Sequence, residues 1–417
     1  MFNTLFERPA ALARQKSTPL AVERRDYLLH LINQGMALKT VRIVAQYLVA
    51  IVERLRLADA PRKQVQRSTI ERQAELWSQR DFRRAITRPR FSRLRFLQHT
   101  KGWLMFMGRL QPPPRPVGAF SIRIEAFADY MRDEQGLSPN TICGRVALLH
   151  DFLLRLNGPR HSLRSIKVQD VDRVLTSKYT LERYGRATIQ TQACSLRAFF
   201  RFAERKGWCR AGLAAAIQSP RVYRNESVPF GPSWDDVQRL LATTEGDRTS
   251  SIRNRAVILL LSVYGLRAGE VVRLRLEDFD WEGERLRVQR PKQRKAQEFP
   301  LVRVVGSAVL RYLKHARPTT KLREVFVTCR PPYRPLHSGT LWPVVARPLR
   351  ALKVRLPHHG PHCLRHACAT HLLNAGLSLK EIGDQLGHTH PDTTRIYAKV
   401  DLTHLREVGR IDLRGLL

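Results

Sequence analysis

Two proline-rich breaks constrain how this chain can fold. The first is a run of four prolines and one arginine at 112–116, and the second is a polar stretch with further prolines from Ser219 to Pro232. Proline lacks an amide hydrogen and has a fixed φ, so these stretches interrupt helices. A chain of 417 residues is also too long for one ordinary hydrophobic core. The sequence therefore predicts three domains, at residues 1–111, 117–222 and 228–417.

The first two blocks are predicted to be helical and related to each other. Residues 34–41 align with residues 135–142 at a constant offset of 101 positions. Amphipathic helices follow, because apolar residues recur every three or four positions at Val41–Leu55 and Val146–Leu156. We interpret this pattern as an internal duplication, with chance similarity between two helical bundles as the alternative. Each block ends in a helix with aromatic and basic residues, at Phe91–Leu110 and Ile189–Trp208.

The third block has a different pattern. Helices are predicted at Asp235–Leu241 and Ser251–Tyr264. Two short strands, Leu286–Gln289 and Glu298–Val304, then flank the basic turn Arg290–Lys295, which predicts a β-hairpin. The predicted fold class is therefore mainly α with a small antiparallel β-sheet (α+β).

Helix boundaries near the end of the chain follow from capping signals. Pro361 suits the first position of one helix, which ends at Asn374–Gly376. The capping box Ser378–Glu381 opens the next helix, and Gly387 closes it. Pro391 opens a further short helix.

The chain is strongly basic. Lysine and arginine total 73 against 36 aspartates and glutamates, which gives a formal net charge of +37 spread along the whole length. Self-repulsion on this scale weakens a fold unless a polyanion neutralises it, so the predicted partner is nucleic acid. A membrane surface is a weaker alternative. The longest apolar stretch, Ala256–Leu266, is shorter than the ~20 residues that a bilayer span needs.

The cysteines and histidines do not predict a metal site or a disulfide scaffold. The six cysteines lie far apart and we find no signal peptide, so we expect them to be reduced and the protein to be cytoplasmic. A zinc site is the alternative, but there is no Cys-x-x-Cys, and a helix would spread the histidines over several faces. We predict no cofactor. The possible ligands are His358, His359, His362, Cys363, His366, Cys368 and His371.

Two arginines, two histidines and a tyrosine in the third block suit a phosphodiester substrate. Arginine forks match phosphate oxygens, and a phenol can attack phosphorus as a covalent nucleophile. A helix start adds amide hydrogens and a positive dipole, and a lysine on the hairpin would give a proton to the leaving 5′ oxygen. The candidate residues are Arg267, His362, Arg365, His388 and Tyr397.

The order and spacing of these residues resemble the catalytic domain of the tyrosine recombinases, the phage-integrase family. The resemblance covers about residues 117–417, and the second block resembles the helical core-binding (SAM-like) domain that completes a clamp around DNA. In the resemblance, Arg267 is the first catalytic arginine, His362 and Arg365 form the His-x-x-Arg box, His388 is the second histidine, and Tyr397 is the nucleophile.

The resemblance also implies a catalytic lysine on the hairpin. Lys292 matches this position when residues are counted back from Pro300, and Lys295 is the alternative. Glu270 and Asp278 match positions that orient or buttress the site.

The function that the resemblance implies is site-specific DNA recombination, by an enzyme of a bacterial mobile element that is nucleoid-associated when bound. Tyr397 would cleave one strand of double-stranded DNA, forming a 3′-phosphotyrosine and a free 5′-hydroxyl. The 5′-hydroxyl of a partner strand would then attack the phosphotyrosine and reseal the DNA, without ATP or metal. Two alternatives stay open. One is a type IB topoisomerase, which runs the same chemistry on one duplex, and the other is a catalytically silent DNA-binding protein.

The two ends of the chain carry separate predictions. The tail after Tyr397 is apolar at mostly helical spacing, and the resemblance implies that it packs on a neighbouring protomer of a tetramer. The alternative is that it folds back onto its own domain.

Residues 1–111 lack the catalytic motifs and are predicted to contact DNA, with a protein–protein contact surface as the alternative. The last helix of this block interleaves cations, expected to track phosphates, with aromatics expected in the core: Arg90, Arg93, Arg95 and Lys101 with Phe91, Phe96, Trp103 and Phe106.

Overall fold

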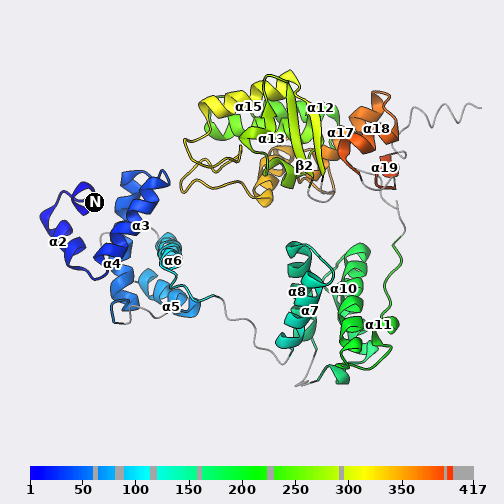
Figure 1. The fold of residues 1–417 in the computed structure, drawn as a ribbon, viewed down its shortest axis with the longest axis horizontal. Helices are drawn as coiled ribbons and strands as arrows, with labels where there is room; N and C mark the ends of the chain where they lie inside the picture. Colours follow the sequence, from blue (N-terminus) through cyan, green and yellow to red (C-terminus); the bar gives the residue numbers. More distant parts are fainter. Residues whose placement is uncertain are drawn as a thin grey trace, which may run out of the picture. The chain divides into compact units, whose positions relative to one another are not determined.

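The computed structural model describes residues 1–59, 64–79, 89–112, 120–156, 162–222, 230–290, 295–388 and 392–397. These residues form mostly helices and one small antiparallel sheet, which confirms the predicted fold class (Figure 1). By backbone contacts the chain divides into two units, residues 1–110 with 227–417, and residues 111–226. The three-block division stays a prediction, because its proline breaks lie largely outside the described residues. No described helix has the length and apolarity of a membrane span.

Residues 1–110 form a helical bundle around α4. The helix is long and amphipathic, and its inward residues Val44 and Leu48 are fully buried against the neighbouring helices. The bundle closes with Trp103, which is also fully buried. The helices are α1 (Phe2–Leu5), α2 (Pro9–Ser17), α3 (Ala21–Asn33), α4 (Leu38–Leu55), α5 (Arg67–Ser78) and α6 (Pro89–Phe106).

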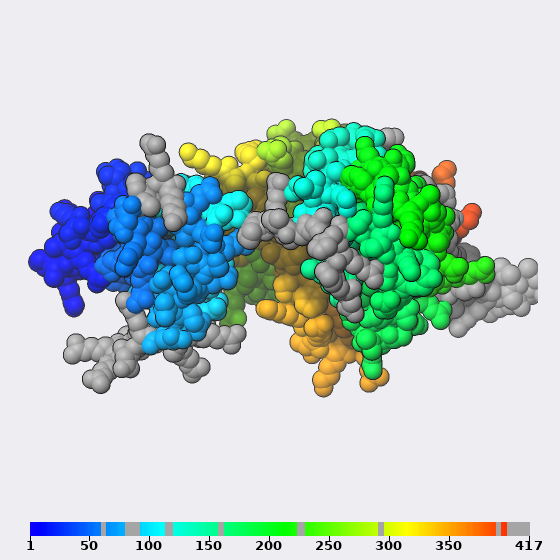
Figure 2. Space-filling model, turned by 90° about the horizontal axis from the view of Figure 1, so that it is seen from below, coloured from blue at the N-terminus to red at the C-terminus, as the bar shows by residue number. Residues whose placement is uncertain are grey.

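Residues 120–217 form a second bundle with an aromatic core, and the cyan and green atoms of the space-filling view show one outer face of it (Figure 2). Phe127, Phe199 and Phe200 meet edge-on, the arrangement that aromatic pairs favour. The helices are α7 (Ser121–Asp133), α8 (Pro139–Leu154), α9 (Val168–Thr180), α10 (Arg186–Arg205) and α11 (Leu213–Ala216).

Residues 230–397 surround the apolar helix α13, which packs against α12, α15, α16 and α17. Its residues from Ala256 to Leu261 are all buried. The elements in this part are α12 (Trp234–Ala242), α13 (Thr249–Val263), α14 (Ala268–Val271), β1 (Phe279–Asp280), β2 (Arg285–Arg290), β3 (Lys295–Pro300), α15 (Arg303–His315), α16 (Trp342–Ala351), α17 (His362–Asn374), α18 (Leu379–Leu386) and α19 (Asp392–Arg395).

The predicted hairpin is confirmed, with differences at its ends. Strands β2 and β3 pair antiparallel with Leu286 opposite Phe299 and Arg290 opposite Lys295, so both basic residues lie in strands rather than in the turn. A third strand, β1, pairs with β2. Because β1 is only two residues long, it has no alternation for a sequence pattern to detect. The tip at 291–294 lies outside the described residues.

The predicted helix caps near the end of the chain are mostly confirmed. Ser378 and Glu381 form the capping box of α18, each side chain accepting the other residue's amide hydrogen. Pro361 is the cap residue of α17 rather than its first helical residue, one position from the prediction. Pro391 lies outside the described residues, and Tyr397 follows α19 in a short 3-10 turn.

Two glycines that end neighbouring helices differ in their surroundings. Gly376 and Gly387 both have positive φ, of 90° and 63°. A Cβ on Gly376 would meet nothing within 4 Å, whereas a Cβ on Gly387 would lie 2.7 Å from the guanidinium of Arg290. Position 387 therefore needs glycine for two reasons, the positive φ and the lack of space for a Cβ beside Arg290.

We expect Gly376→Ala to cost roughly 1–2 kcal/mol, the penalty of a left-handed alanine. Gly387→Ala should cost more, because Arg290 must also move. Hydrogen exchange of the α17 and α18 amides in the full chain measures the two local opening free energies. Equal losses in the two variants would contradict the contact with Arg290.

Candidate active site

The end of helix α18 is a meeting point for three arginines. Arg365, on the first turn of α17, is 2% exposed and donates from Nη1 to the Gly265 carbonyl at 2.7 Å and from Nη2 to the Leu386 carbonyl at 2.6 Å. Burial, aided by the nearby charge of Arg267, lowers the pKa of Arg365 to about 10. The guanidinium is still protonated at neutral pH, so it is a fixed positive charge.

The second arginine, Arg267, is held by Glu270. Glu270 Oε2 accepts the Arg267 amide hydrogen at 2.8 Å as a cap of α14, and Oε1 accepts from Arg267 Nη1 at 2.7 Å. Arg267 Nη2 donates to the Gly387 carbonyl at 3.2 Å. The Arg267 side chain is 30% exposed whereas Glu270 is 3% exposed. Part of the Arg267 side chain is therefore open to solvent.

The third arginine, Arg290, was missed by the sequence interpretation, which assigned it to the hairpin turn. It is 1% exposed and donates to the carbonyls of Leu386 at 2.7 Å and Gln385 at 2.9 Å. Its Nη1 lies 3.5 Å from Glu270 Oε1. Strand alternation could have found it, because inward residues of β2 occur at every second position and Arg290 continues that series.

The charges of this cluster do not balance. Among the described residues three guanidiniums face one carboxylate, Glu270, and the remaining acceptors are uncharged carbonyl groups at the end of α18 and at Gly265. Desolvation lowers the pKa of Arg290 as well as that of Arg365. A buried excess of positive charge destabilises a fold unless a bound anion neutralises it. A phosphate group can do so, because its oxygens accept paired hydrogen bonds from two guanidiniums.

His388 lies directly after the helix end that the arginines contact. Its amide donates to the Gly383 carbonyl at 2.9 Å, and its Nδ1 lies 2.7 Å from Thr394 Oγ1. Burial and the charges of Arg365, Arg267 and Arg290 lower the pKa of His388 to about 3. The imidazole is therefore neutral at neutral pH and acts as a hydrogen-bonding group rather than a cation.

Tyr397 is buried beside α17. It is 1% exposed, and its hydroxyl lies 2.9 Å from Nδ1 of His366, a residue that the sequence interpretation gave no catalytic role. Burial raises the pKa of Tyr397 to about 12 and lowers that of His366 to about 4. Both groups are neutral at neutral pH. The sequence signal that could have pointed to His366 is its place in the His-x-x-Arg-His motif, one helical turn after His362.

Of the other predicted site residues, the structure describes His362 and Asp278 but not the side chains of the two lysines. His362 is exposed at the first position of α17, with its ring edge-on to that of His366 at 4.6 Å. Asp278 accepts an amide hydrogen of Arg275 at 2.8 Å and caps a 3-10 turn at Leu276–Asp278, away from the arginine cluster. Lys292 and the side chain of Lys295 lie outside the described residues.

Helices α17, α18 and α19 bring the described candidates together (Figure 1). Arg267, Arg365 and His388 surround one helix end, and the charge of Arg365 also acts on Tyr397. Among the described residues no group of three or more His, Cys, Asp or Glu is arranged to hold a metal. Burial raises the pKa of both Cys363 and Cys368 to about 12.

Comparisons with known proteins agree with this geometry. The model of the phage integrase N-terminal SAM-like domain matches residues 124–207, and the phage integrase family model matches residues 233–404. The putative integrase/recombinase y4rA of Sinorhizobium fredii is 37% identical over 288 residues, which are 69% of this chain and 69% of that protein. Tyrosine recombinase XerC of Oceanobacillus iheyensis is 29% identical over 295 residues, 68% of this chain and 93% of its own.

The fold is shared with solved structures. The XerH site-specific recombinase bound to its palindromic difH substrate, in a post-cleavage complex, has a TM-score of 0.54 at 16% identity, covering 82% of this chain and 96% of that chain. The two family models together follow the second bundle and the domain around α13 almost from end to end. With an arginine cluster and a buried tyrosine in that domain, and with these relatives, the chain belongs to the phage integrase family of tyrosine recombinases.

Proposed function

We propose that Tyr397 of this tyrosine recombinase attacks a phosphorus atom of the DNA backbone. The phenol oxygen forms a bond to phosphorus while the bond to the 5′ oxygen breaks, leaving a 3′-phosphotyrosine and a free 5′-hydroxyl. The phenol passes its proton to a water molecule, and Lys292 gives a proton to the leaving oxygen. The reverse reaction with a 5′-hydroxyl of a partner strand reseals the DNA. One phosphodiester is exchanged for another at each step, so no ATP is required.

The observation that carries this proposal is the unbalanced arginine cluster. Arg267 and Arg365 both donate to the end of α18, and the Arg267 side chain stays partly open to solvent. The transition state for attack on phosphorus carries extra negative charge on its equatorial oxygens. Cations that are already held in place stabilise this charge without having to reorganise.

The two histidines have different proposed roles. His388 is neutral, so it would donate a hydrogen bond from its ring N–H to the phosphate without adding charge. His362 begins α17, where the positive end of the helix dipole favours an anion. Both would orient the phosphate between the arginines.

Tyr397 must move before it can react. Its hydroxyl is bonded to His366 and its ring is buried with Cys368 and Leu386, so a backbone phosphate cannot reach the oxygen there. At a pKa of about 12 the phenol is almost wholly protonated at neutral pH. Attack therefore requires both release from this position and loss of the proton near the arginines.

The wider function follows from the relatives. A relative named integrase/recombinase and one named XerC favour strand exchange between two duplexes over the single-duplex reaction of a topoisomerase. We propose that the chain acts in the cytoplasm of a bacterium, on the ends of a mobile element, and assembles as a tetramer when two sites are joined. Residues 402–417 would link neighbouring protomers.

Tyr397→Phe should bind duplex DNA normally but form no covalent adduct, because only the nucleophilic oxygen is removed. Arg267→Ala should keep the nucleophile but slow adduct formation by roughly 10²–10³-fold, as expected for loss of one transition-state contact. A nicked duplex traps the adduct, which a denaturing gel then resolves. An adduct of wild-type yield from Tyr397→Phe would disprove the assignment.

Lys292→Ala should slow cleavage more than Lys295→Ala, since only the former is proposed to protonate the leaving oxygen. A substrate with sulfur at the bridging 5′ position needs no proton on its leaving group. It should therefore restore the rate of Lys292→Ala alone, measured as single-turnover adduct formation. Selective rescue of Lys295→Ala would transfer the role to that residue.

Deleting residues 402–417 should leave binding to a single site unchanged and abolish the joining of two duplexes, because the links between protomers are removed. Gel mobility of single-site and paired-site complexes separates the two effects. A truncated chain that exchanged strands between two duplexes at the wild-type rate would rule out the tail as the link.

A further inference from the structure

The first bundle repeats the second, helix by helix. Helices α3 and α7 have the same length of 13 residues. The next helices begin at Leu38 and Pro139, and the third at Arg67 and Val168, both pairs 101 positions apart. The fourth helices, α6 and α10, end at Phe106 and Arg205. The correspondence therefore extends over four helices, well beyond the eight residues that the sequence aligns.

The turns repeat as well. Gly35 and Gly136 follow the first helix of each bundle, and both have positive φ. Gly108 and Gly207 follow the fourth helix with φ of 67° and 65°. After each fourth helix the glycine amide donates three residues back, and the next amide donates five residues back. Matching backbone geometry at both positions makes chance similarity of two bundles a poor explanation.

The packing follows the same order. In the first bundle α3 packs on α4, α4 on α6, and α5 on α6. In the second, α7 packs on α8, α8 on α10, and α9 on α10. The SAM-like family model matches only the second copy, at residues 124–207. Residues 21–110 are therefore a second bundle of the same architecture that has diverged in sequence.

Charge distinguishes the two copies. Residues 1–110 contain 22 lysines and arginines against 8 aspartates and glutamates, whereas residues 111–226 contain 19 against 10. The copy without a family match is therefore the more basic one. A diverged copy that served only as a spacer, or as an apolar contact between protomers, would not need this excess.

The cationic and aromatic side chains of α6 differ in burial and in ion pairing. Phe96 and Trp103 are fully buried, as expected for core residues, whereas Phe106 is exposed. Arg93 is paired with Glu75 at 2.7 Å, and Lys101 lies 4.0 Å from Glu71. Of the four cations predicted on this helix, Arg95 is exposed and forms no ion pair with another described residue, and the Arg90 side chain lies outside the described part of the chain.

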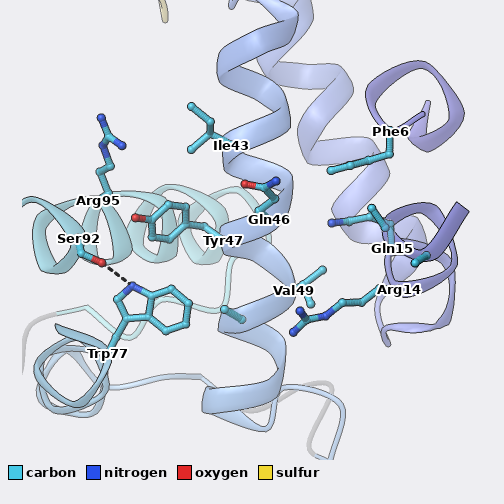
Figure 3. Close-up of a pocket in the computed structure, with 13 residues that line it drawn as sticks. Phe6, Arg14, Gln15, Ile43, Gln46, Tyr47, Val49, Trp77, Ser92 and Arg95 are labelled. Carbon is cyan, nitrogen blue, oxygen red and sulfur yellow. Dashed lines mark hydrogen bonds between the residues drawn. The ribbon is translucent and has the colours of Figure 1, made fainter. Parts of the chain in front are cut away.

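Arg95 borders a hollow beside the outer face of α4. The hollow has a volume of about 720 Å³, and Ile43, Gln46, Tyr47 and Arg95 line it (Figure 3). Lys39 lies on the same stripe of α4, four residues before Ile43, and is exposed without an ion pair to a described residue. The matching positions of the second copy are also exposed: Asn140, Ala147 and Cys194. Both bundles therefore leave this face uncovered.

We propose that residues 1–110 bind duplex DNA through this face of α4 and α6, with Lys39 and Arg95 on backbone phosphates. Exposed cations without acidic partners lose little on contacting phosphate and release counterions from the DNA. The polar groups of Gln46 and Tyr47 at the hollow add hydrogen-bond donors for the sugar–phosphate backbone. The inference rests on the proposed function for the choice of duplex DNA as the substrate, but it concerns a surface distinct from the catalytic cluster.

The test compares two double variants of the full chain that remove the same charge. Lys39→Ala with Arg95→Ala changes the proposed face, and Arg67→Ala with Arg72→Ala removes two exposed arginines of α5 that form no ion pair with a described residue. Binding to a long mixed-sequence duplex is measured by anisotropy over a range of salt concentrations. The logarithm of the binding constant decreases as the logarithm of the salt concentration rises. This decrease should become less steep, by about 0.9 in the slope, for each phosphate that the protein no longer neutralises. We expect this for the first variant and a much smaller change for the second.

Further outcomes decide between the partners. Lys39→Arg with Arg95→Lys should keep the wild-type slope, since the charges remain. Equal slope changes in the two alanine variants would overturn the proposal, because overall charge rather than this face would then attract DNA. An unchanged slope together with loss of self-association in sedimentation would overturn it in favour of a second copy of the chain. Adduct formation at saturating protein should stay normal in all variants, which separates this inference from the role of Tyr397.

Discussion

The carbonyl groups at the end of α18 hold the phage integrase domain together at its candidate active site. Leu386 accepts from both Arg290 and Arg365, and Gly387 accepts from Arg267. The last carbonyls of a helix have no partner within the helix and carry its negative partial charge, so guanidinium donors are favourable there. Because the three donors come from β2, α17 and the turn before α14, one helix end fixes the positions of three separate elements.

Burying these charged groups stabilises the domain less than an apolar core would. Arg290 and Arg365 are almost fully buried, and Glu270 is the carboxylate that contacts the cluster. Apolar residues of similar volume would avoid the desolvation of these charges. A site that keeps excess positive charge under such conditions is typical of one that binds an anion. Gly387, which leaves no room for a side chain over Arg290, shows how closely the helix end is fitted to the guanidinium.

Burial acts on the other groups of the site in opposite directions. It raises the pKa of Tyr397 and lowers the pKa values of His366 and His388, so all three are neutral at neutral pH. The arginines therefore supply the charge among these described groups, and it does not change near neutral pH. In the proposed reaction the phenol has to lose its proton, and the positive charge of Arg365 already favours the phenolate.

Local signals in the sequence determined much of this protein. Apolar periodicity predicted the long helices, the capping box at Ser378 predicted the start of α18, and the order of Arg267, His362, Arg365, His388 and Tyr397 indicated the family. These features depend on residues close together in the chain or on a motif order that can be read without knowing the fold.

Tertiary structure decided the rest. The pairing of Tyr397 with His366 and the shared acceptor of Arg290 and Arg365 join residues from different elements, so no local pattern contains them. The four-helix repeat was visible in the sequence only around Gly35 and Gly136, because bundle cores accept many apolar residues while the backbone arrangement persists. Spacing along the chain thus gave the candidate functional residues, and packing between distant segments gave them their charge state and contacts.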